Sequence, residues 1–169
     1  VIRGVALVDD IPSRGTTGKW NELRDKKALI IHYGGTLRPD TGVNLFCAAV
    51  ETLAKKGCTL ACTVIFKVTG VGSFDEIRAL RTRIGDHGKV RIEVHSGLNK
   101  FEYDALIHSC HASMSLRQPG TAISSTTFPS KVVEITSRGL ALISSDQGDV
   151  TTLFDEHSAF LLKTYDAIK

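Results

Sequence analysis

Short apolar runs alternate with stretches of helical periodicity along most of this chain, and this alternation constrains the fold more than any other feature. Apolar residues that recur every three or four positions predict amphipathic helices, whereas short β-branched and apolar runs predict strands. The predicted strands are 28–33, 60–68, 90–94, 111–116, 140–144 and 159–162. The predicted helices are 44–56, 74–84, 101–109, a segment that opens at Pro129, and one turn at 149–154. Such alternation predicts an α/β, Rossmann-like parallel sheet with helices on both faces.

The composition is that of a globular domain. The chain has 169 residues, 42% of them hydrophobic and 23% charged, with a formal net charge of +3. This length suffices for one well-buried domain, and the mild charge, without a dense Lys/Arg tract, does not indicate nucleic acid. No apolar run reaches the length of a transmembrane segment. We predict a domain over residues 28–169 after a linker or extension over 1–27, cut from a longer protein because no methionine opens the chain.

The cysteines and histidines form no metal-binding or catalytic pattern. The four cysteines lie among apolar residues without partners at zinc-ligand spacing, so we expect them to be reduced, non-catalytic and in a cytosolic setting. His32 and His95 come near predicted strand ends and could face a ligand, but we favour packing or capping roles for both. The sequence also lacks the nucleophile elbow of a hydrolase and the full dinucleotide fingerprint.

The segment from Ser125 to Gly139 is the strongest candidate for a ligand site. Pro129 suits the first helical position, preceded by hydroxyl residues that can cap free amides, and Gly139 suits the helix end. Lys131 and Glu134 share one face near the helix N-terminus, where unpaired N–H groups favour phosphate. A carboxylate one turn further on can accept hydrogen bonds from a sugar. The alternative is a solvated ion pair on an ordinary surface helix.

Five predicted loops follow strands and should surround this segment, because ligands of parallel α/β sheets bind beyond the carboxyl ends of the strands. These loops are 34–42, 69–73, 95–100, 117–128 and 145–149. Glycines recur in several of them, which lets backbone approach a ligand closely.

Taken together and in order, these motifs resemble the C-terminal half of the group 1 glycosyltransferases, a GT-B family that uses nucleotide-activated sugars. The stretch 33–42 is similar to the family's first strand-loop, where a glycine is followed by Arg and then by Pro-Glu-Lys-Gly. The turn at Gly97 and the stretch 128–139 resemble two further motifs, as does Arg117 in the loop between them. The resemblance covers about residues 27 to 162.

The resemblance implies a donor-binding domain. Glu134 would accept hydrogen bonds from the nucleotide ribose, while Ser130, Lys131 and the helix amides would hold the diphosphate. The glycines of the first loop would let it approach the phosphates, and backbone at the Gly97 turn would line the base. The donor-binding residues implied in this way are Gly34, Gly35, Thr36, Arg38, Gly97, Leu98, Arg117, Thr127, Ser130, Lys131 and Glu134.

The resemblance also implies the partners of the full enzyme. It would transfer a sugar from a UDP- or GDP-linked donor to a hydroxyl of an acceptor glycan or lipid-linked sugar, as in polysaccharide biosynthesis, with no metal and no cofactor. A missing N-terminal GT-B domain would hold the acceptor, so the isolated domain would be inactive. We expect a cytoplasmic location, or attachment to the inner membrane face through the missing domain.

Departures from the family pattern leave two rivals. Thr36 and Thr41 stand where the family has Arg and Lys, and Thr126 stands where it has an earlier glutamate. Arg38, Arg117 and Lys131 could supply the missing positive charge if they converge on the helix N-terminus. Scattered arginines would favour a degenerate, non-catalytic domain that binds a partner protein. Half of a sugar epimerase or phosphorylase is the other alternative, since it would share the fold and the phosphate site.

Overall fold

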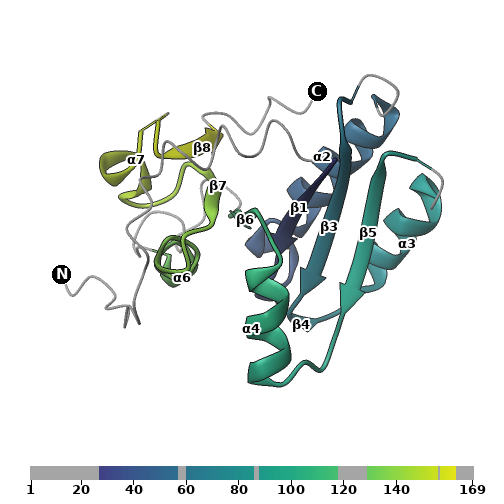
Figure 1. Ribbon diagram of the computed structural model, residues 1–169, viewed down its shortest axis with the longest axis horizontal. Helices are drawn as coiled ribbons and strands as arrows, with labels where there is room; N and C mark the ends of the chain where they lie inside the picture. The colour runs from purple at the N-terminus through teal and green to yellow at the C-terminus, as the bar shows by residue number, and fades with distance from the viewer. Residues whose placement is uncertain (1–26, 57–59, 86–87, 118–128, 156, 163–169) are drawn as a thin grey trace.

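The computed structural model describes residues 27–56, 60–85, 88–117, 129–155 and 157–162, which Figure 1 draws in colour. The predicted extension therefore lies outside the described residues except for Lys27, and so do Thr126 and Thr127. The boundary at residue 28 stays a prediction. No helix in the described ranges is long and apolar enough to cross a membrane.

Six strands form one parallel sheet in the order β5-β3-β1-β6-β7-β8. The strands are β1 (Ala28–Tyr33), β3 (Thr63–Thr69), β5 (Val90–His95), β6 (Ala112–Ser115), β7 (Ala141–Ser145) and β8 (Ala159–Leu162). Every neighbouring pair runs parallel, so the predicted fold class is confirmed. The strand order reverses between β1 and β6, which makes the crevice beside β1 the expected ligand position.

Helices pack on both faces of this sheet, as predicted. They are α2 (Val43–Lys55), α3 (Asp75–Ile84), α4 (Lys100–His108), α6 (Ser130–Ser137) and the single turn α7 (Val150–Leu153). Alternate residues of a strand point to opposite faces. Ile31 joins a cluster with α2 and α3, whereas Ile30 packs against the cluster of α4 and α6. Figure 1 shows α2 and α3 beside β1, β3 and β5.

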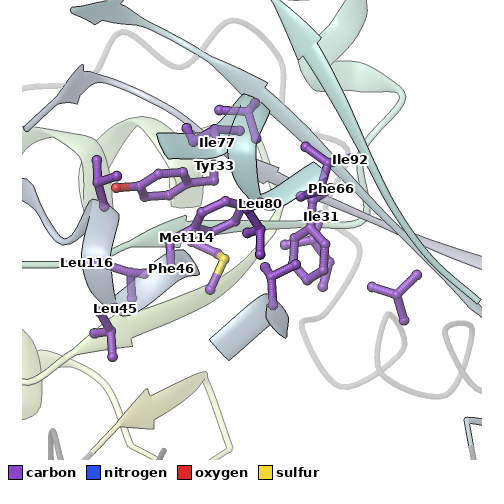
Figure 2. Packing of buried hydrophobic residues seen from close by; sticks show 14 of the residues in the cluster. Ile31, Tyr33, Leu45, Phe46, Phe66, Ile77, Leu80, Ile92, Met114 and Leu116 are labelled. Atoms are coloured by element: carbon purple, nitrogen blue, oxygen red, sulfur yellow. The ribbon is translucent and has the colours of Figure 1, made fainter. Parts of the chain in front are cut away.

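Aromatic packing anchors the larger cluster. The rings of Tyr33 and Phe46 stack at 4.3 Å, and Phe66 meets Phe46 edge-on at 5.5 Å. Figure 2 shows these rings surrounded by Ile77 and Leu80 of α3, both fully buried. This packing secures β1 from one face and so fixes the position of the loop that follows it.

Several boundaries differ from the predicted ones. β3 begins at Thr63 rather than residue 60, because the residues before it form a bend. Pro129 is the N-cap of α6 rather than its first helical residue, since its ψ of 118° is extended; proline fixes only φ. Gly139 ends α6 as predicted. Gly139 has a φ of 64°, and its amide donates to the carbonyl of Thr136. The amide of Leu140 donates to the carbonyl of Ile135, which completes a Schellman motif.

A second, two-stranded sheet was not predicted. β2 (Thr36–Leu37) pairs in parallel with β4 (Val71–Gly72), and a 3₁₀ turn, η1 (Pro39–Thr41), follows β2. The amide of Val71 donates to the carbonyl oxygen of Gly35 at 3.0 Å, which ties the loops after β1 and β3 together. These loops then form one wall at the carboxyl ends of their strands.

Candidate functional site

A cleft of about 540 Å³ opens at the carboxyl ends of β1, β3 and β5. Six residues that the sequence assigned to donor binding line it: Gly35, Thr36, Gly97, Leu98, Lys131 and Glu134. The sequence did not assign the other lining residues. Thr69, Gly70 and Val71 come from the loop after β3, and His95, Asn99, Lys100 and Tyr103 come from the end of β5 and the start of α4.

Lys131 crosses the cleft from the first turn of α6. Its Nζ donates to the carbonyl oxygen of Gly34 at 2.5 Å, and its side chain is partly buried. Burial lowers the pKa of Lys131, an effect that the nearby Glu134 carboxylate opposes. The structure therefore does not support the alternative of a solvated surface ion pair. It shows a lysine held at the loop after β1.

The N-terminal amides of α6 add partial positive charge beside that of Lys131. The amide of Val132 donates to the carbonyl of Pro129, but those of Ser130 and Lys131 have no acceptor among the described residues. Unpaired amides at a helix N-terminus carry a partial positive charge that favours anions. The side chain of Ser130 is exposed and does not line the cleft, so only its backbone fits the predicted role.

Glu134 lies one turn further along α6 and is held by Tyr103 of α4. The Tyr103 hydroxyl donates to Glu134 Oε1 at 2.8 Å. Arg138 Nε lies 3.8 Å from the same oxygen, and Asp104 fixes this guanidinium through a 2.7 Å contact. Glu134 is thus neither turned into bulk water nor sealed away, because its side chain is 37% exposed and lines the cleft.

The two arginines proposed to supply extra charge do not line the cleft. Arg38 is exposed and pairs with Asp40 at 3.2 Å. The backbone of Arg117 donates to Ser145 Oγ at 2.9 Å, and its side chain is not among those at the cleft. Thr41 accepts from the Arg38 amide and donates to the carbonyl of Thr36, so its hydroxyl is used within its own loop. Of the three cations whose convergence would separate the alternatives, Lys131 lines the cleft and the two arginines do not.

His32 lies beneath the cleft in a buried chain of hydrogen bonds. Its Nδ1 and Nε2 lie 2.8 Å from Ser113 Oγ and Thr69 Oγ1, and only 1% of the residue is exposed. Burial, with smaller effects of Lys131 and Arg138, lowers the pKa of His32 to about 3. The favoured packing role is therefore what the structure shows for His32. His95 lines the cleft, and the packing or capping role favoured for it stays a prediction.

Burial also accounts for the cysteines that the structure describes. It raises the pKa of the Cys47 thiol to about 11 and also raises the pKa of the Cys110 thiol. A thiol with a raised pKa is a poor nucleophile at neutral pH, because the thiolate is the reactive form. Cys47, Cys62 and Cys110 are free, and Cys58 lies outside the described residues.

Gly34 has a structural reason to be glycine that differs from the predicted one. It was assigned to let the loop approach phosphates, but a Cβ there would lie 2.4 Å from Thr69 Oγ1 and 2.7 Å from His32 Nε2. Gly34 is itself buried. The absence of a side chain at Gly34 therefore lets the chain leave β1 close to the hydrogen-bonded His32 and Thr69 side chains. Of the two neighbouring glycines, it is Gly35 that lines the cleft.

Replacing Gly34 with alanine should therefore lower the free energy of unfolding by about 1–3 kcal/mol, the usual cost of overpacking a tight site. Urea denaturation measures this change. Gly88→Ala is the matched control, because the nearest atom to a Cβ there is 3.8 Å away. Equal stability of the two variants would show that the close contacts of Gly34 are easily relieved.

Comparisons with known proteins bear on this fold. A scan against protein-family models and a search of curated proteins found no match. Solved structures do match. The C-terminal domain of a group 1 family glycosyl transferase (LpcC) from Francisella tularensis is 15% identical, with a TM-score of 0.58, over 93% of this chain and 80% of that one.

Two longer chains are similar over a smaller share of their length. HepE from Anabaena, solved with UDP-glucose, is 18% identical with a TM-score of 0.54, over 90% of this chain and 39% of its own. The UDP-forming trehalose-phosphate synthase of Burkholderia xenovorans is 12% identical with a TM-score of 0.60, over 92% and 36%. The chain thus spans less than half the length of these enzymes and has the fold of a GT-B glycosyltransferase C-terminal domain.

Proposed function

We propose that this chain is the donor-binding half of a glycosyltransferase that uses a nucleotide-diphosphate sugar. One observation carries the proposal: Lys131 and Glu134, one turn apart at the N-terminus of α6, line a single cleft with the glycine-containing loops after β1 and β5. An ammonium and a carboxylate at this spacing match the diphosphate and the ribose of one nucleotide.

The chemistry of the proposed site follows from where charge develops. As the sugar leaves, negative charge builds on the nucleotide diphosphate, and fixed cations and amide donors stabilise it. Lys131 and the first amides of α6 would provide this stabilisation without metal or cofactor. Glu134 would accept from the ribose hydroxyls, and backbone at Gly97 and Leu98 would line the base. The complex of HepE with UDP-glucose supports a UDP-linked donor, and GDP is the other base class considered.

The rest of the enzyme would lie in sequence beyond this chain. A second, N-terminal domain would hold the acceptor, a glycan or lipid-linked sugar, and the reaction would take place between the two domains. Polysaccharide synthesis in the cytoplasm, or at the inner membrane face, fits such an enzyme. The 169-residue chain alone is then expected to bind donor nucleotides without turning them over.

Calorimetric titration of the chain with UDP, GDP and ADP tests the proposal. We expect binding of at least one nucleotide, and weaker binding of the corresponding nucleoside, because the diphosphate contacts are lost. No heat and no NMR shift with any of the three at millimolar concentration would contradict donor binding.

Glu134→Gln should weaken binding of the preferred nucleotide about tenfold, since a hydrogen bond to a charged group contributes about 1.5–3 kcal/mol and the amide retains part of it. The measurement is calorimetry on both proteins, with circular dichroism to verify folding. Exposed Glu102, which caps α4 through the Asn99 amide, gives the control Glu102→Gln. An unchanged affinity in Glu134→Gln would remove Glu134 from the ribose site.

A degenerate, partner-binding domain is the second candidate, and the positions of Arg38 and Arg117 favour it. Arg38 pairs within its own loop and Arg117 is not at the cleft, so Lys131 is the only one of the three proposed cations there. The same titration separates the two functions. A domain that kept the fold but lost the donor site would bind none of the nucleotides.

A further inference from the structure

The interface between α4 and α6 holds the Glu134 carboxylate in place. Its Oε1 accepts the Tyr103 hydroxyl at 2.8 Å, and Arg138 Nε lies 3.8 Å from the same atom. Arg138 is fixed in turn by Asp104 at 2.7 Å. Among the described residues, the polar contacts of the carboxylate are both to Oε1, from Tyr103 and Arg138. Oε2 is therefore the oxygen with capacity to accept from a ligand in the cleft.

Tyr103 is well suited to hold a carboxylate because its own ring is fixed. The ring meets His32 edge-on at 6.0 Å, and the Arg138 guanidinium lies over its face at 5.6 Å. Burial and the hydrogen bond to Glu134 raise the pKa of Tyr103 above its ordinary value. At neutral pH the hydroxyl keeps its proton and remains a donor, which is the state that the contact with Glu134 requires.

We propose that Tyr103 is the positioning residue that orients Glu134 toward the ribose of the bound nucleotide. The inference rests on the proposed function and adds a residue to it. The Tyr103 hydroxyl occupies Oε1, which leaves Oε2 to accept from a ribose hydroxyl in the cleft that Glu134 lines. A flexible glutamate would lose rotamer freedom on binding, whereas a glutamate already fixed loses little. Tyr103 therefore increases the selectivity of the site for ribose hydroxyls.

Tyr103→Phe tests this role in the 169-residue chain, because it removes the hydroxyl and keeps the ring contacts. The probes are UDP and GDP, each compared with its 2′,3′-dideoxy counterpart by calorimetry. We expect the unaltered chain to prefer the ribonucleotide about tenfold, and Tyr103→Phe to reduce that preference to about threefold or less, the range for losing one charge-assisted hydrogen bond. Thr136→Val is the control, because it deletes an α6 hydroxyl that donates, within the described part of the chain, to the backbone carbonyls of Val132 and Val133.

The outcomes distinguish this inference from the proposed function. A ribose preference that is unchanged in Tyr103→Phe, with the nucleotide still bound, overturns the inference and leaves the proposed function intact. If Tyr103 had a purely structural role, Tyr103→Phe would weaken binding of the ribonucleotide and of its dideoxy counterpart equally. The ribose preference would then also be unchanged. If the unaltered chain binds no nucleotide, both proposals fall.

A double-mutant cycle in urea verifies the contact on which the inference depends. The single variants Tyr103→Phe and Glu134→Gln are compared with the double variant. We expect the two changes to be non-additive, because Tyr103→Phe removes the donor of this hydrogen bond and Glu134→Gln removes the charge of its acceptor. Additive effects on stability would show that the hydroxyl and the carboxylate do not interact in solution, and this result would also overturn the inference.

Discussion

Replacing Lys131 with methionine should weaken binding of UDP or GDP about 30- to 100-fold, the range for losing a partly desolvated charged contact to a phosphate. Lys131 is the cation that reaches across the cleft from α6 to the loop after β1. Methionine keeps much of the length and apolar volume of the lysine stem, so the change removes mainly the charge. Calorimetry with the diphosphates measures the loss.

Two comparisons show whether this loss reflects contact with the diphosphate. Binding of uridine or guanosine should change less than about twofold, because neither carries a phosphate for the ammonium to contact. Lys100→Met removes a second lysine that lines the cleft but is 92% exposed and paired with Asp104. Exposed charges contribute little, so that variant should lose less than about threefold. An equal loss in both lysine variants would indicate a diffuse field rather than a specific contact.

The sheet could be predicted because its strands are encoded locally. β1, β3 and β8 are short, mainly apolar runs, and the observed β1 and β8 match the predicted strands at both ends. The small β2–β4 sheet has no such signal, since its strands have only two residues each. They form because the loops after β1 and β3 are brought side by side by the larger sheet. Pairing of this kind depends on the tertiary fold.

The candidate site also combines features encoded locally with features that depend on the tertiary fold. Lys131 and Glu134 were found because both lie on one helix, where their spacing in sequence fixes their spacing in space. Tyr103 was missed, since only the packing of α4 against α6 brings it to Glu134. The ion pair of Arg38 is of another kind, because its partner Asp40 lies two residues away in the sequence. A nearby carboxylate in the same loop was a visible reason to doubt that this arginine was available for phosphate.

The buried His32 should make the fold sensitive to acid. Its pKa of about 3 in the folded protein lies below the ordinary histidine value of 6.5. The unfolded chain therefore binds this proton more readily, and the stability present above pH 6.5 is lost as the pH falls toward 3. The expected loss from this group, relative to pH 7, is about 2 kcal/mol at pH 5 and about 3 kcal/mol at pH 4.

Urea denaturation between pH 7 and pH 4 measures this decline, and His32→Gln should flatten it although that variant starts less stable. His108→Gln is the control at an exposed histidine and should keep the steep decline. A slope as steep in His32→Gln as in the unaltered chain would assign the acid sensitivity to other groups. NMR titration of the unaltered chain gives a second measurement, in which the His32 imidazole should stay neutral down to the onset of unfolding. Because His32 is buried and bonds Thr69 in the cleft wall, its protonation would place a desolvated charge beneath the loops after β1 and β3.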